Sequence, residues 1–361
     1  MENRAMNDTG IQIRPLEKIP GVRAVAALVP AQSYQRRAPT QLRIHAPDSH
    51  QHLDHFSKID SRLPAQRLFA LPEVTVLGKG HILAQNLLVQ DNLEGGHPPS
   101  KLLPELARAD VRPVQTIDEP LLYVTRYGVK NYGHCLTDIV PRIVHALRTR
   151  PDLKVGIHPQ FVEAALEALD DLGISLQRCV LLPEHPVRLT QGFFPSACNQ
   201  HPLTHCPTSL QLLRSRLPDL LQKAQAAEPS SRGKRLFVTR DDASTRHLTR
   251  HADVLAALQQ HGMTPVTTGR LSHAQQARLF HEADEIVALA GASLSNLLYC
   301  RPGTRVTMIA PTTMPALYFW DLASQCELDF RVGYFPATHP SKGIHSDVEA
   351  APADILALHT A

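Results

Sequence analysis

Apolar and polar residues follow different patterns along the 361-residue chain. Residues 1–75 contain only short apolar runs among polar residues, so we expect this region to be irregular. From about residue 82 onwards, short apolar runs alternate with segments of helical periodicity, which is typical of an α/β protein. The strands expected before residue 196 are Ile82–Val89, Leu121–Thr125, Lys154–Ile157, Val180–Leu182 and Gln191–Pro195, and the helices expected before residue 227 are 134–149, 160–172 and 208–226.

The polar stretch Ala226–Gly233 contains Pro and Gly, which favours a linker. Beyond it strands and helices alternate regularly, which predicts a parallel, doubly wound sheet. The expected strands are Arg235–Thr239, Thr264–Thr267, Glu285–Leu289 and Arg305–Ile309, and the expected helices are Ala252–His261, stopped by Gly262, one from a Ser272 cap to His281, and Ala292–Cys300. Such sheets bind ligands at the carboxyl ends of their strands, so we look for a site just after residues 239, 267, 289 and 309.

Composition and charge exclude some classes of protein. Apolar residues make up 43% and charged residues 20%, as in globular proteins. The formal charge of +3 lacks the basic excess of a dedicated nucleic-acid binder. Cys135 and Cys300 lie in apolar runs, which favours reduced thiols. Since the N-terminus has no apolar signal region, we expect a cytoplasmic protein and leave a peripheral association with the inner face of the membrane open.

Two arginines follow the strand expected to end at Thr239. Arg240 and Arg246 lie in one strand-to-helix loop, where two guanidiniums can converge on a diphosphate through bidentate bonds. The alternative is a solvated pair with Asp241 and Asp242, and these two aspartates alone do not predict a metal site.

Small residues follow the strand expected to end at Leu289. The segment that contains Gly291, Ala292, Ser293 and Asn296 allows close approach to the backbone and opens a helix, whose first N–H groups favour an anion. The alternative is a tight turn with Ser293 as a cap. The three spaced glycines of the dinucleotide fingerprint are absent.

A third segment runs from Asn131 to Arg142. If it is helical, His134, Asp138 and Arg142 lie on one stripe, and either of the first two is a candidate general base. The alternative is an ordinary amphipathic helix with a polar outer face. Pro141 must kink this helix or begin a new one.

A fourth segment has soft metal ligands close together at Cys198, His201, His205 and Cys206. These residue types resemble a zinc site. However, His205 and Cys206 are adjacent and point in different directions in regular structure, and no second ligand pair has a matching spacing. We therefore do not predict a metal site.

Taken together, the first three segments resemble glycosyltransferase family 61. The family motif N-(Y/F)-G-H-W-x-x-(D/E)-x-x-P-R is similar to residues 131–142, and its H-G-A-x-L-x-N-x-x-F motif is similar to residues 290–299. A strand that ends in Arg, with a second Arg six residues later, is similar to Arg240 and Arg246. The resemblance covers about residues 120–335, so it leaves the N-terminal 75 residues outside.

This chain departs from the family pattern in three places. Cys135 replaces the aromatic residue after the motif His, Arg250-His251 replaces an expected Asn-Glu, and Ala290 replaces the His before Gly-Ala. The last change removes a side chain that could contact phosphate or sugar, whereas none of the three removes the arginine pair.

The resemblance implies an α/β fold of the GT-B kind, in which two Rossmann-like domains have parallel sheets that face each other across a cleft. We expect an irregular region over 1–75, an acceptor domain over 76–228, a nucleotide-sugar domain over 232–336 and a C-terminal tail over 337–361. The implied activity is inverting transfer of a hexose or pentose, such as xylose, arabinose or N-acetylglucosamine, from a nucleotide-diphosphate donor. Of such donors, we expect a UDP-sugar first. The acceptor would be a glycan or lipid-linked glycan in capsule or exopolysaccharide biosynthesis.

Each candidate residue receives a role on this basis. Donor binding is assigned to Arg240, Arg246, Gly291, Ala292, Ser293 and Asn296, the acceptor cleft to Asn131 and Arg142, and catalysis to Asp138 as general base with His134 as runner-up. No metal or other cofactor is expected, because arginines and a helix N-terminus can stabilise a leaving diphosphate. Two other functions stay open: a nucleotide-sugar epimerase on the same fold, and a non-catalytic nucleotide-sugar or polysaccharide-binding module, which Ala290 suggests.

Overall fold

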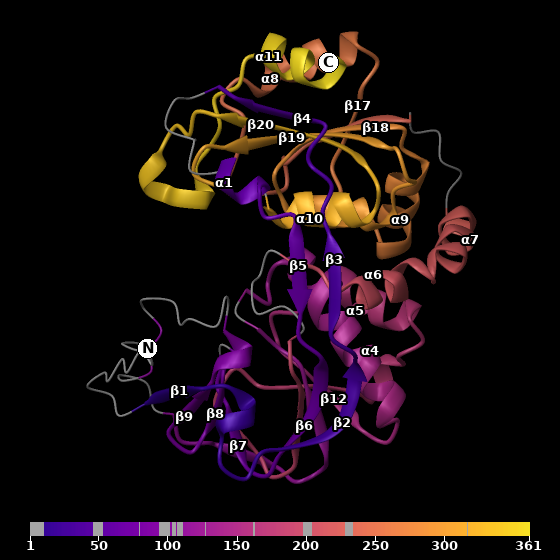
Figure 1. Cartoon of the computed structure of the whole chain (residues 1–361). Helices are drawn as coiled ribbons and strands as arrows, with labels where there is room; N and C mark the ends of the chain where they lie inside the picture. Colours follow the sequence, from indigo (N-terminus) through magenta and orange to yellow (C-terminus); the bar gives the residue numbers. More distant parts are fainter. Residues whose placement is uncertain are drawn as a thin grey trace. The chain divides into compact units, whose positions relative to one another are not determined.

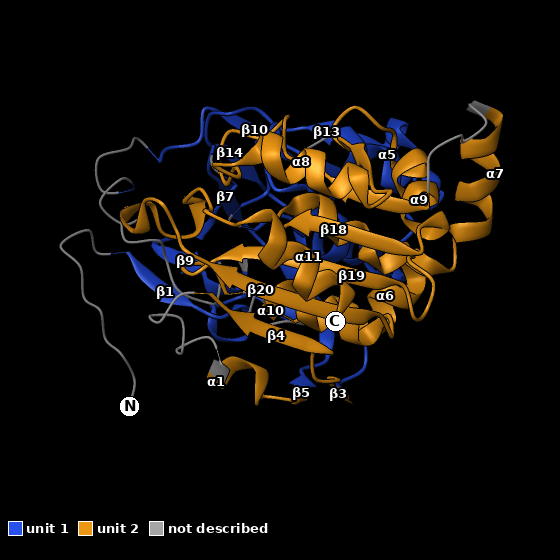
Figure 2. Ribbon diagram, turned by 90° about the horizontal axis from the view of Figure 1, so that it is seen from above, with its two compact units in different colours: residues 1–32, 62–202 blue, residues 33–61, 203–361 orange. Residues whose placement is uncertain are grey.

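The structure, a computed structural model, describes residues 11–45, 53–78, 80–93, 102, 106, 111–126, 128–161, 163–197, 204–227, 234–315 and 317–361. The chain divides into two compact units (Figure 2): unit 1 comprises residues 1–32 and 62–202, and unit 2 comprises residues 33–61 and 203–361. The division falls after residue 202 rather than in the expected linker 226–233, of which residues 228–233 lie outside the described residues.

Unit 1 contains two sheets. Sheet A has the order β1 (Gln12–Arg14), β9 (Leu87–Val89), β8 (Ile82–Ala84), β7 (Val74–Val76), β14 (Val187–Leu189) and β10 (Gln115–Ile117). Sheet B has the order β13 (Cys179–Leu181), β12 (Lys154–Ile157), β11 (Leu121–Tyr123), β15 (Gly192–Pro195), β6 (Gln66–Leu71) and β2 (Arg23–Val29). The first four strands of sheet B are parallel, and β6 and β2 continue it in antiparallel pairing.

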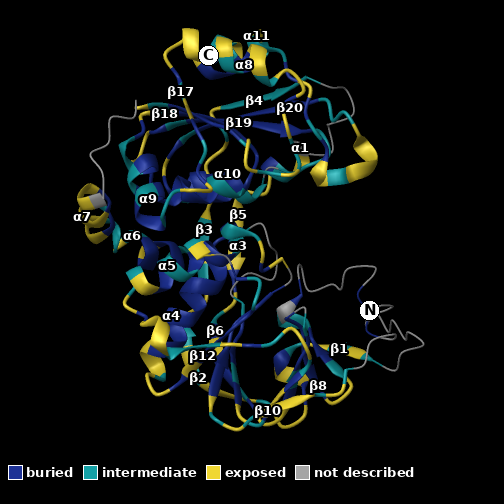
Figure 3. Cartoon of the chain, turned by 180° about the vertical axis from the view of Figure 1, so that it is seen from behind, coloured by how far each residue is buried: buried dark blue, intermediate teal, exposed yellow. Residues whose placement is uncertain are grey.

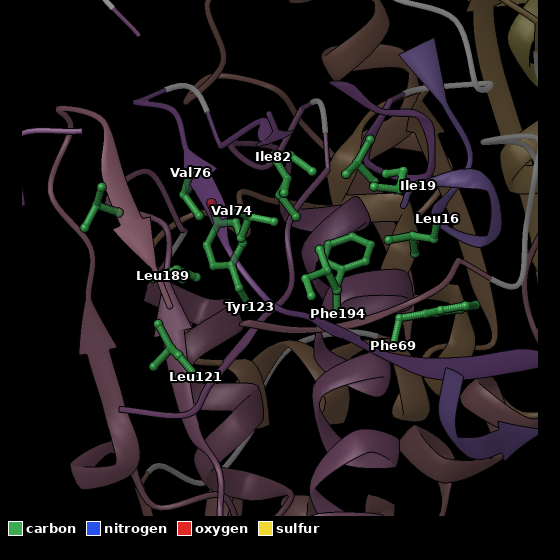
Figure 4. Packing of buried hydrophobic residues seen from close by; sticks show 14 of the residues in the cluster. Leu16, Ile19, Phe69, Val74, Val76, Ile82, Leu121, Tyr123, Leu189 and Phe194 are labelled. Carbon is green, nitrogen blue, oxygen red and sulfur yellow. The ribbon is translucent and has the colours of Figure 1, made fainter. Parts of the chain in front are cut away.

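One hydrophobic cluster joins the two sheets of unit 1 (Figure 4). Val74 and Ile82 of sheet A pack in the same cluster as Phe194 and Tyr123 of sheet B, and each of these side chains is at most 3% exposed. Burial of such a side chain contributes about 1.5–3 kcal/mol. The cluster therefore fixes sheet B, whose carboxyl strand ends carry one of the candidate segments.

Helices cover sheet B of unit 1. They include α3 (Tyr132–His134), the π-helix η5 (Cys135–Ile139), α4 (Val140–Thr149) and α5 (Glu163–Asp171), and the short helices η1 (Leu16–Lys18), η3 (Gln90–Asn92) and η6 (Leu176–Arg178) lie elsewhere in the unit. Helix α4 packs on β2, β15 and α5. It is buried over residues 140–147, so the polar outer face expected for an ordinary amphipathic helix is not found there.

Unit 2 contains one parallel sheet. Its order is β17 (Thr264–Val266), β16 (Arg235–Val238), β18 (Glu285–Leu289), β19 (Arg305–Pro311), β20 (Asp329–Phe335) and β4 (Gln41–Ile44). The first five strands follow the chain order of a doubly wound sheet, as the alternation of strands and helices predicts. Figure 2 shows β18, β19, β20 and β4 side by side.

Helices lie on both faces of this sheet (Figure 1). Helices α8 (His251–Gln260) and α11 (Pro352–Thr360) cover one face, and α9 (His273–Glu282), the 3₁₀-helix η7 (Ala292–Tyr299) and α10 (Leu317–Gln325) cover the other. The strands between them are buried, whereas the outer sides of α8 and α11 are exposed (Figure 3). Ser272 caps α9 as expected, in a capping box with Gln275.

Charged residues form a row at the amino ends of four neighbouring strands of unit 2. Arg235, Glu285, Arg305 and Asp329 alternate in sign along the sheet. Arg235 Nε lies 2.8 Å from Glu285 Oε2, and Arg305 Nε lies 3.3 Å from Asp329 Oδ2. This end of the sheet is thus neutralised by its own side chains, in contrast to the opposite end described below.

The first 75 residues differ most from expectation, because they form strands rather than an irregular region. The expected irregular stretch contains β1 to β7, including β3 (Gln32–Gln35) and β5 (Asp60–Leu63), together with the short helix α1 (Leu53–Phe56). Strand β4 pairs in parallel with β20 from the far end of the chain. A short half-buried strand of this kind takes its stability from a distant partner, which the local pattern does not reveal.

Asp321 of α10 ties the N-terminal segment into unit 2. Tyr34 Oη and Arg36 Nε donate to its Oδ1 at 2.7 and 2.5 Å. The backbone N–H and Nδ1 of His205 and Nε2 of Gln325 donate to Oδ2 at 2.8, 2.9 and 2.9 Å. The Asp321 side chain is 0% exposed, and these donors offset the cost of burying its charge.

Two other expected elements are corrected. The run Ile82–Val89 is a hairpin of β8 and β9 rather than one strand, and its turn residue Gln85 has φ of 55°. The expected helix 208–226 is two helices, α6 (Pro207–Arg214) and α7 (Leu217–Ala227). The break lies just before Pro218, which the first turn of a helix tolerates and a helix interior does not.

Candidate functional site

The candidate donor segments follow two adjacent strands of unit 2. Strands β16 and β18 are neighbours, although β17 lies between them in the chain. This is the position where a doubly wound sheet reverses its strand order, and ligands of such sheets bind beside it. The structure thus brings the Arg240 loop and the Gly291 turn together at the carboxyl ends of β16 and β18.

Arg240 lies directly against the Gly291 turn. A Cβ atom on Gly291 would come within 1.8 Å of Arg240 Nη1, so only glycine leaves room for the guanidinium there. Gly291 has φ of −171°, which any residue adopts, so the need for glycine comes from space rather than from backbone strain. On its other side, Arg240 Nη2 donates to the Thr245 carbonyl at 3.0 Å.

Arg246 lies close to Arg240 in a strained backbone conformation. Its φ is 61°, a value that is uncommon for a residue other than glycine. Its Nη1 lies 3.1 Å from Sδ of Met314, in the loop after β19. Burial lowers the pKa of Arg246 to about 10, and the positive charge of Arg240 contributes to the same shift, so the residue is still charged at neutral pH.

The two guanidiniums lack a negative partner among the described residues. No carboxylate of the described chain forms an ion pair with either, and both Nε atoms are buried without a hydrogen-bond partner there. Burial also lowers the pKa of Arg240, against the effect of Asp242. In addition, the N-terminus of helix η7 starts at the same turn and carries partial positive charge. The potential at this end of the sheet therefore favours an anion.

The two aspartates next to Arg240 stabilise loops instead of pairing with the arginines. Thr239 Oγ1 donates to Asp241 Oδ2 at 2.8 Å, and the Gly269 N–H donates to Asp242 Oδ2 at 2.9 Å. A Cβ atom on Gly269 would collide with the Asp242 carboxylate, at 2.2 Å. The solvated Arg–Asp pairs that we weighed as an alternative are thus not found in the structure.

Of the small residues in the turn, Ser293 and Asn296 have different surroundings. Ser293 Oγ lies 2.7 Å from Thr268 Oγ1, which links the turn to the loop after β17. Asn296 is fully buried, and its Nδ2 donates to Gln276 Oε1 at 2.8 Å and to the Ser293 carbonyl at 3.0 Å. Asn296 therefore holds the shape of the turn, whereas Ala292 and Ser293 present the first N–H groups of η7.

In unit 1, the segment from Asn131 to Pro141 contains a π-helical turn between two α-helical ones. Asn131 is the N-cap of α3 and accepts a hydrogen bond from the Gly133 N–H at 2.9 Å. The chain then forms the π-helical turn η5 and continues into α4, which has Pro141 in its first turn. A new helix start, one of the two outcomes expected at Pro141, is thus found, and the turn just before it is π-helical. Such turns occur often at functional sites.

Asp138 lies in this π-turn between two arginines. Arg126 Nη1 and Arg142 Nη1 both approach its Oδ2, at 3.3 and 3.5 Å, and all three side chains are at most 8% exposed. Arg142 also donates to the Pro195 carbonyl and stacks over the Phe194 ring, with Cζ 5.1 Å from the ring centroid. The contacts of Asp138 use Oδ2, which leaves Oδ1 as the oxygen that could accept a proton.

His134 lies one π-turn before Asp138 and is half-buried. A Cβ atom added to Gly128 would lie 3.4 Å from the His134 Cδ2. The contacts found for Asp138 include Arg126 and Arg142 and no hydrogen bond to His134. The pairing expected from helical spacing is therefore not formed. Sequence reasoning missed Arg126. It comes directly after the expected strand Leu121–Thr125, three residues beyond the end of β11, and the rule applied to Arg240 could have found it.

Metal-binding side chains do not gather in the described part of the chain. No group of three or more His, Cys, Asp or Glu residues there is arranged to hold an ion. Cys198 and His201 lie outside the described residues, while His205 bonds to Asp321 and Cys206 is the N-cap of α6. Across the same described ranges, no helix combines the length and apolar character needed to cross a bilayer.

The structure is that of an α/β protein in which two buried arginines lie at the switch point of a parallel sheet. Residues 132–307 match the model of the family Glycosyltransferase 61. This range includes Asp138, Arg142, Arg240, Arg246 and the Gly291 turn. The match shows that this part of the chain is similar to glycosyltransferase family 61. No curated protein matches the chain.

Proposed function

We propose that this protein is an inverting glycosyltransferase that moves a hexose or pentose from a nucleoside-diphosphate donor, first of all a UDP-sugar, to a glycan or lipid-linked glycan. The proposal includes the GT-B arrangement, with the donor bound by unit 2 and the acceptor by unit 1. It also includes a role in capsule or exopolysaccharide biosynthesis and a cytoplasmic location with peripheral membrane association. These details rest on the motif resemblance given above, and the family match supports the activity.

One observation carries the donor side of the proposal. Arg240 is close enough to Arg246 to lower its pKa, both side chains are desolvated, and neither pairs with a carboxylate among the described residues. Arg240 lies against the Gly291 turn, where η7 begins. Positive groups held in this way without a counter-ion are costly, and an anion that binds all of them removes the cost. A diphosphate matches two planar guanidiniums and the N–H groups of Ala292 and Ser293.

On the acceptor side, Asp138 is the proposed general base. In the reaction, the acceptor hydroxyl gives its proton to Asp138 Oδ1 while its oxygen bonds to the anomeric carbon of the donor. The bond from that carbon to the phosphate oxygen breaks on the opposite face, and the nucleoside diphosphate leaves with the electron pair. Arg240 and Arg246 stabilise the charge that develops on the leaving group. His134 is the runner-up base, because histidine is the side chain that most often acts as a general base.

The same arginines make a divalent metal unnecessary in the proposed reaction. Asp241 and Asp242 accept hydrogen bonds from Thr239 and Gly269, so these carboxylates already have structural partners. We expect transfer to continue at its full rate in excess EDTA. Activity that EDTA abolishes and Mn²⁺ or Mg²⁺ restores would contradict this part of the proposal.

The test begins with binding and continues to transfer. We expect UDP or another nucleoside diphosphate to raise the thermal midpoint, since a ligand that binds only the native state stabilises it by mass action. UDP-xylose, UDP-arabinose and UDP-N-acetylglucosamine are then incubated with a panel of glycan acceptors, and products are identified by mass spectrometry. If no nucleoside diphosphate binds, the proposed function is wrong.

Two outcomes would favour the other functions instead. An isomeric nucleotide-sugar that forms from the donor alone would indicate an epimerase. Tight UDP binding without turnover with any acceptor would indicate a binding module. The buried Ala290 beside the turn favours this alternative, because it provides no polar side chain.

A further inference from the structure

Arg126 is a buried cation that neither the motif resemblance nor the proposed reaction uses. It follows strand β11 and the fully buried Thr125, at the carboxyl end of a parallel strand in sheet B. Its Nη1 lies 3.3 Å from Asp138 Oδ2, and its side chain is 8% exposed. It is therefore held beside the proposed base from a different element of unit 1.

The two arginines around Asp138 are not equivalent. Arg142 is 1% exposed, donates to the Pro195 carbonyl and lies over the Phe194 ring. These contacts attach α4 to β15, so Arg142 has a structural role besides its contact with Asp138. Asp91 of η3 also interacts with Arg142 through its charge. By contrast, the contact of Arg126 within the described chain is the one to Asp138. Of the two arginines, Arg126 is thus the one whose described contact is with Asp138 alone.

The geometry of this contact selects one oxygen of the carboxylate. Both arginines approach Oδ2, Arg126 from the segment after β11 and Arg142 from α4. A carboxylate fixed through one oxygen cannot rotate freely, so its second oxygen keeps a defined direction. In catalysis, a displacement of about 1 Å in a reacting group can cost about 100-fold in rate.

We propose that Arg126 is a positioning residue for the acceptor half of the reaction. It holds Asp138 by Oδ2 and so keeps Oδ1 directed to the acceptor hydroxyl. This inference rests on the proposed function, in which Asp138 is the base. It assigns Arg126 no contact with the donor, whose diphosphate is bound by unit 2.

The experiment compares Arg126→Gln, Arg126→Lys and the control Arg148→Gln, an exposed arginine on α4. Transfer is measured as UDP release from the UDP-sugar that proves active, with acceptor varied and donor saturating, and UDP affinity is measured separately. We expect Arg126→Gln to lower kcat by about 10- to 100-fold with little change in KM, while UDP affinity stays unchanged. Arg126→Lys should restore part of the rate, and Arg148→Gln should match the wild type.

A double variant separates positioning from a structural role. If Arg126 acts through Asp138, Arg126→Gln should add little to the loss caused by Asp138→Asn, because both changes remove the same function. Additive losses would overturn the proposal, and so would wild-type kcat in Arg126→Gln or an equal loss of UDP affinity. If Arg126→Gln does not fold, Arg126→Lys in the wild-type and Asp138→Asn backgrounds gives the same comparison. Failure of the proposed function itself would be recognised by the absence of wild-type transfer.

Discussion

Arg36 and Asp321 are 285 positions apart in the chain, and a hydrogen bond of 2.5 Å joins Nε of the first to Oδ1 of the second. Asp321 accepts further bonds from Tyr34, His205 and Gln325. One buried carboxylate thus connects the N-terminal segment, the start of the second half of the chain and helix α10, all within unit 2.

Asp321→Asn should destabilise the protein strongly. The amide cannot accept from all these donors, and it leaves the buried Arg36 without its counter-ion, a change that typically costs about 3–5 kcal/mol. Urea unfolding should show this loss, whereas the matched change at the exposed Asp253 should cost less than about 1 kcal/mol. A loss below about 1 kcal/mol for Asp321→Asn would contradict the role that we give this residue.

The pH dependence of this contribution has a defined sign. Burial alone would raise the pKa of Asp321, but the hydrogen bond and charge of His205, the charge of Arg36 and the hydrogen bond from Tyr34 outweigh it and lower the pKa below 3.8. The stabilisation is therefore present above about pH 4 and is lost as pH falls through the lowered pKa.

Arg240→Ala should weaken UDP binding without unfolding unit 2. Charge-assisted hydrogen bonds contribute about 1.5–3 kcal/mol each, which corresponds to a loss of about 10- to 150-fold in affinity. Titration calorimetry would measure it, with Arg250→Ala as control, since Arg250 is exposed and pairs with Asp253. Unchanged UDP affinity in a folded Arg240→Ala variant would place the diphosphate elsewhere.

Gly291→Ala should act through Arg240. The added methyl group would lie 1.8 Å from Arg240 Nη1, so the guanidinium must move, while the extended backbone at residue 291 accepts alanine. We expect UDP affinity to fall by about 10-fold or more with the fold retained. In an Arg240→Ala background the obstacle is gone, and Gly291→Ala should then have almost no further effect. A large additional loss there would show that the methyl group blocks the ligand directly.

His145 should make the protein less stable as pH falls from about 6.5 to about 4. Burial, followed by the charge of Arg148, lowers the pKa of His145 from 6.5 to about 4. Between these values the unfolded chain binds a proton that the folded protein does not, so stability rises with pH in this window. Urea unfolding at several pH values should show a smaller slope for His145→Gln than for the wild type. An equal reduction in the exposed control His261→Gln would refute this assignment.

The sequence predicted the sheet of unit 2 well, because its strands are buried runs with clear ends. Glu285–Leu289 was predicted with the bounds it has, and Gly262, with φ of 77°, stops α8 as expected. Ser272 was predicted as a cap from local chemistry alone. In each case the signal lies within a few residues of the element it describes.

The parts that were missed depend on partners far away in the chain. Strand β4 pairs with β20 from the far end of the chain, and β8 and β9 were merged because the apolar run does not mark the turn at Gln85. In the candidate site, the structure shows Arg126 beside Asp138. This contact identifies Arg126 as a site residue, and the sequence alone does not reveal it. Spacing along an ideal helix also predicted a contact between His134 and Asp138, which the π-turn does not provide.

The pairing of β4 with β20 also bears on how the chain is made. Residues 41–44 emerge from the ribosome long before residues 329–335 are synthesised. The pairing of β4 with β20 can therefore form only when nearly the whole chain has been made. The hydrogen bonds of Tyr34 and Arg36 to Asp321 can likewise form only after residue 321 has been synthesised. A fragment that begins at residue 203 would expose the edge of β20 and leave the Asp321 carboxylate without two of its donors. Production of residues 203–361 alone should therefore give an aggregating product unless residues 33–61 are supplied as well.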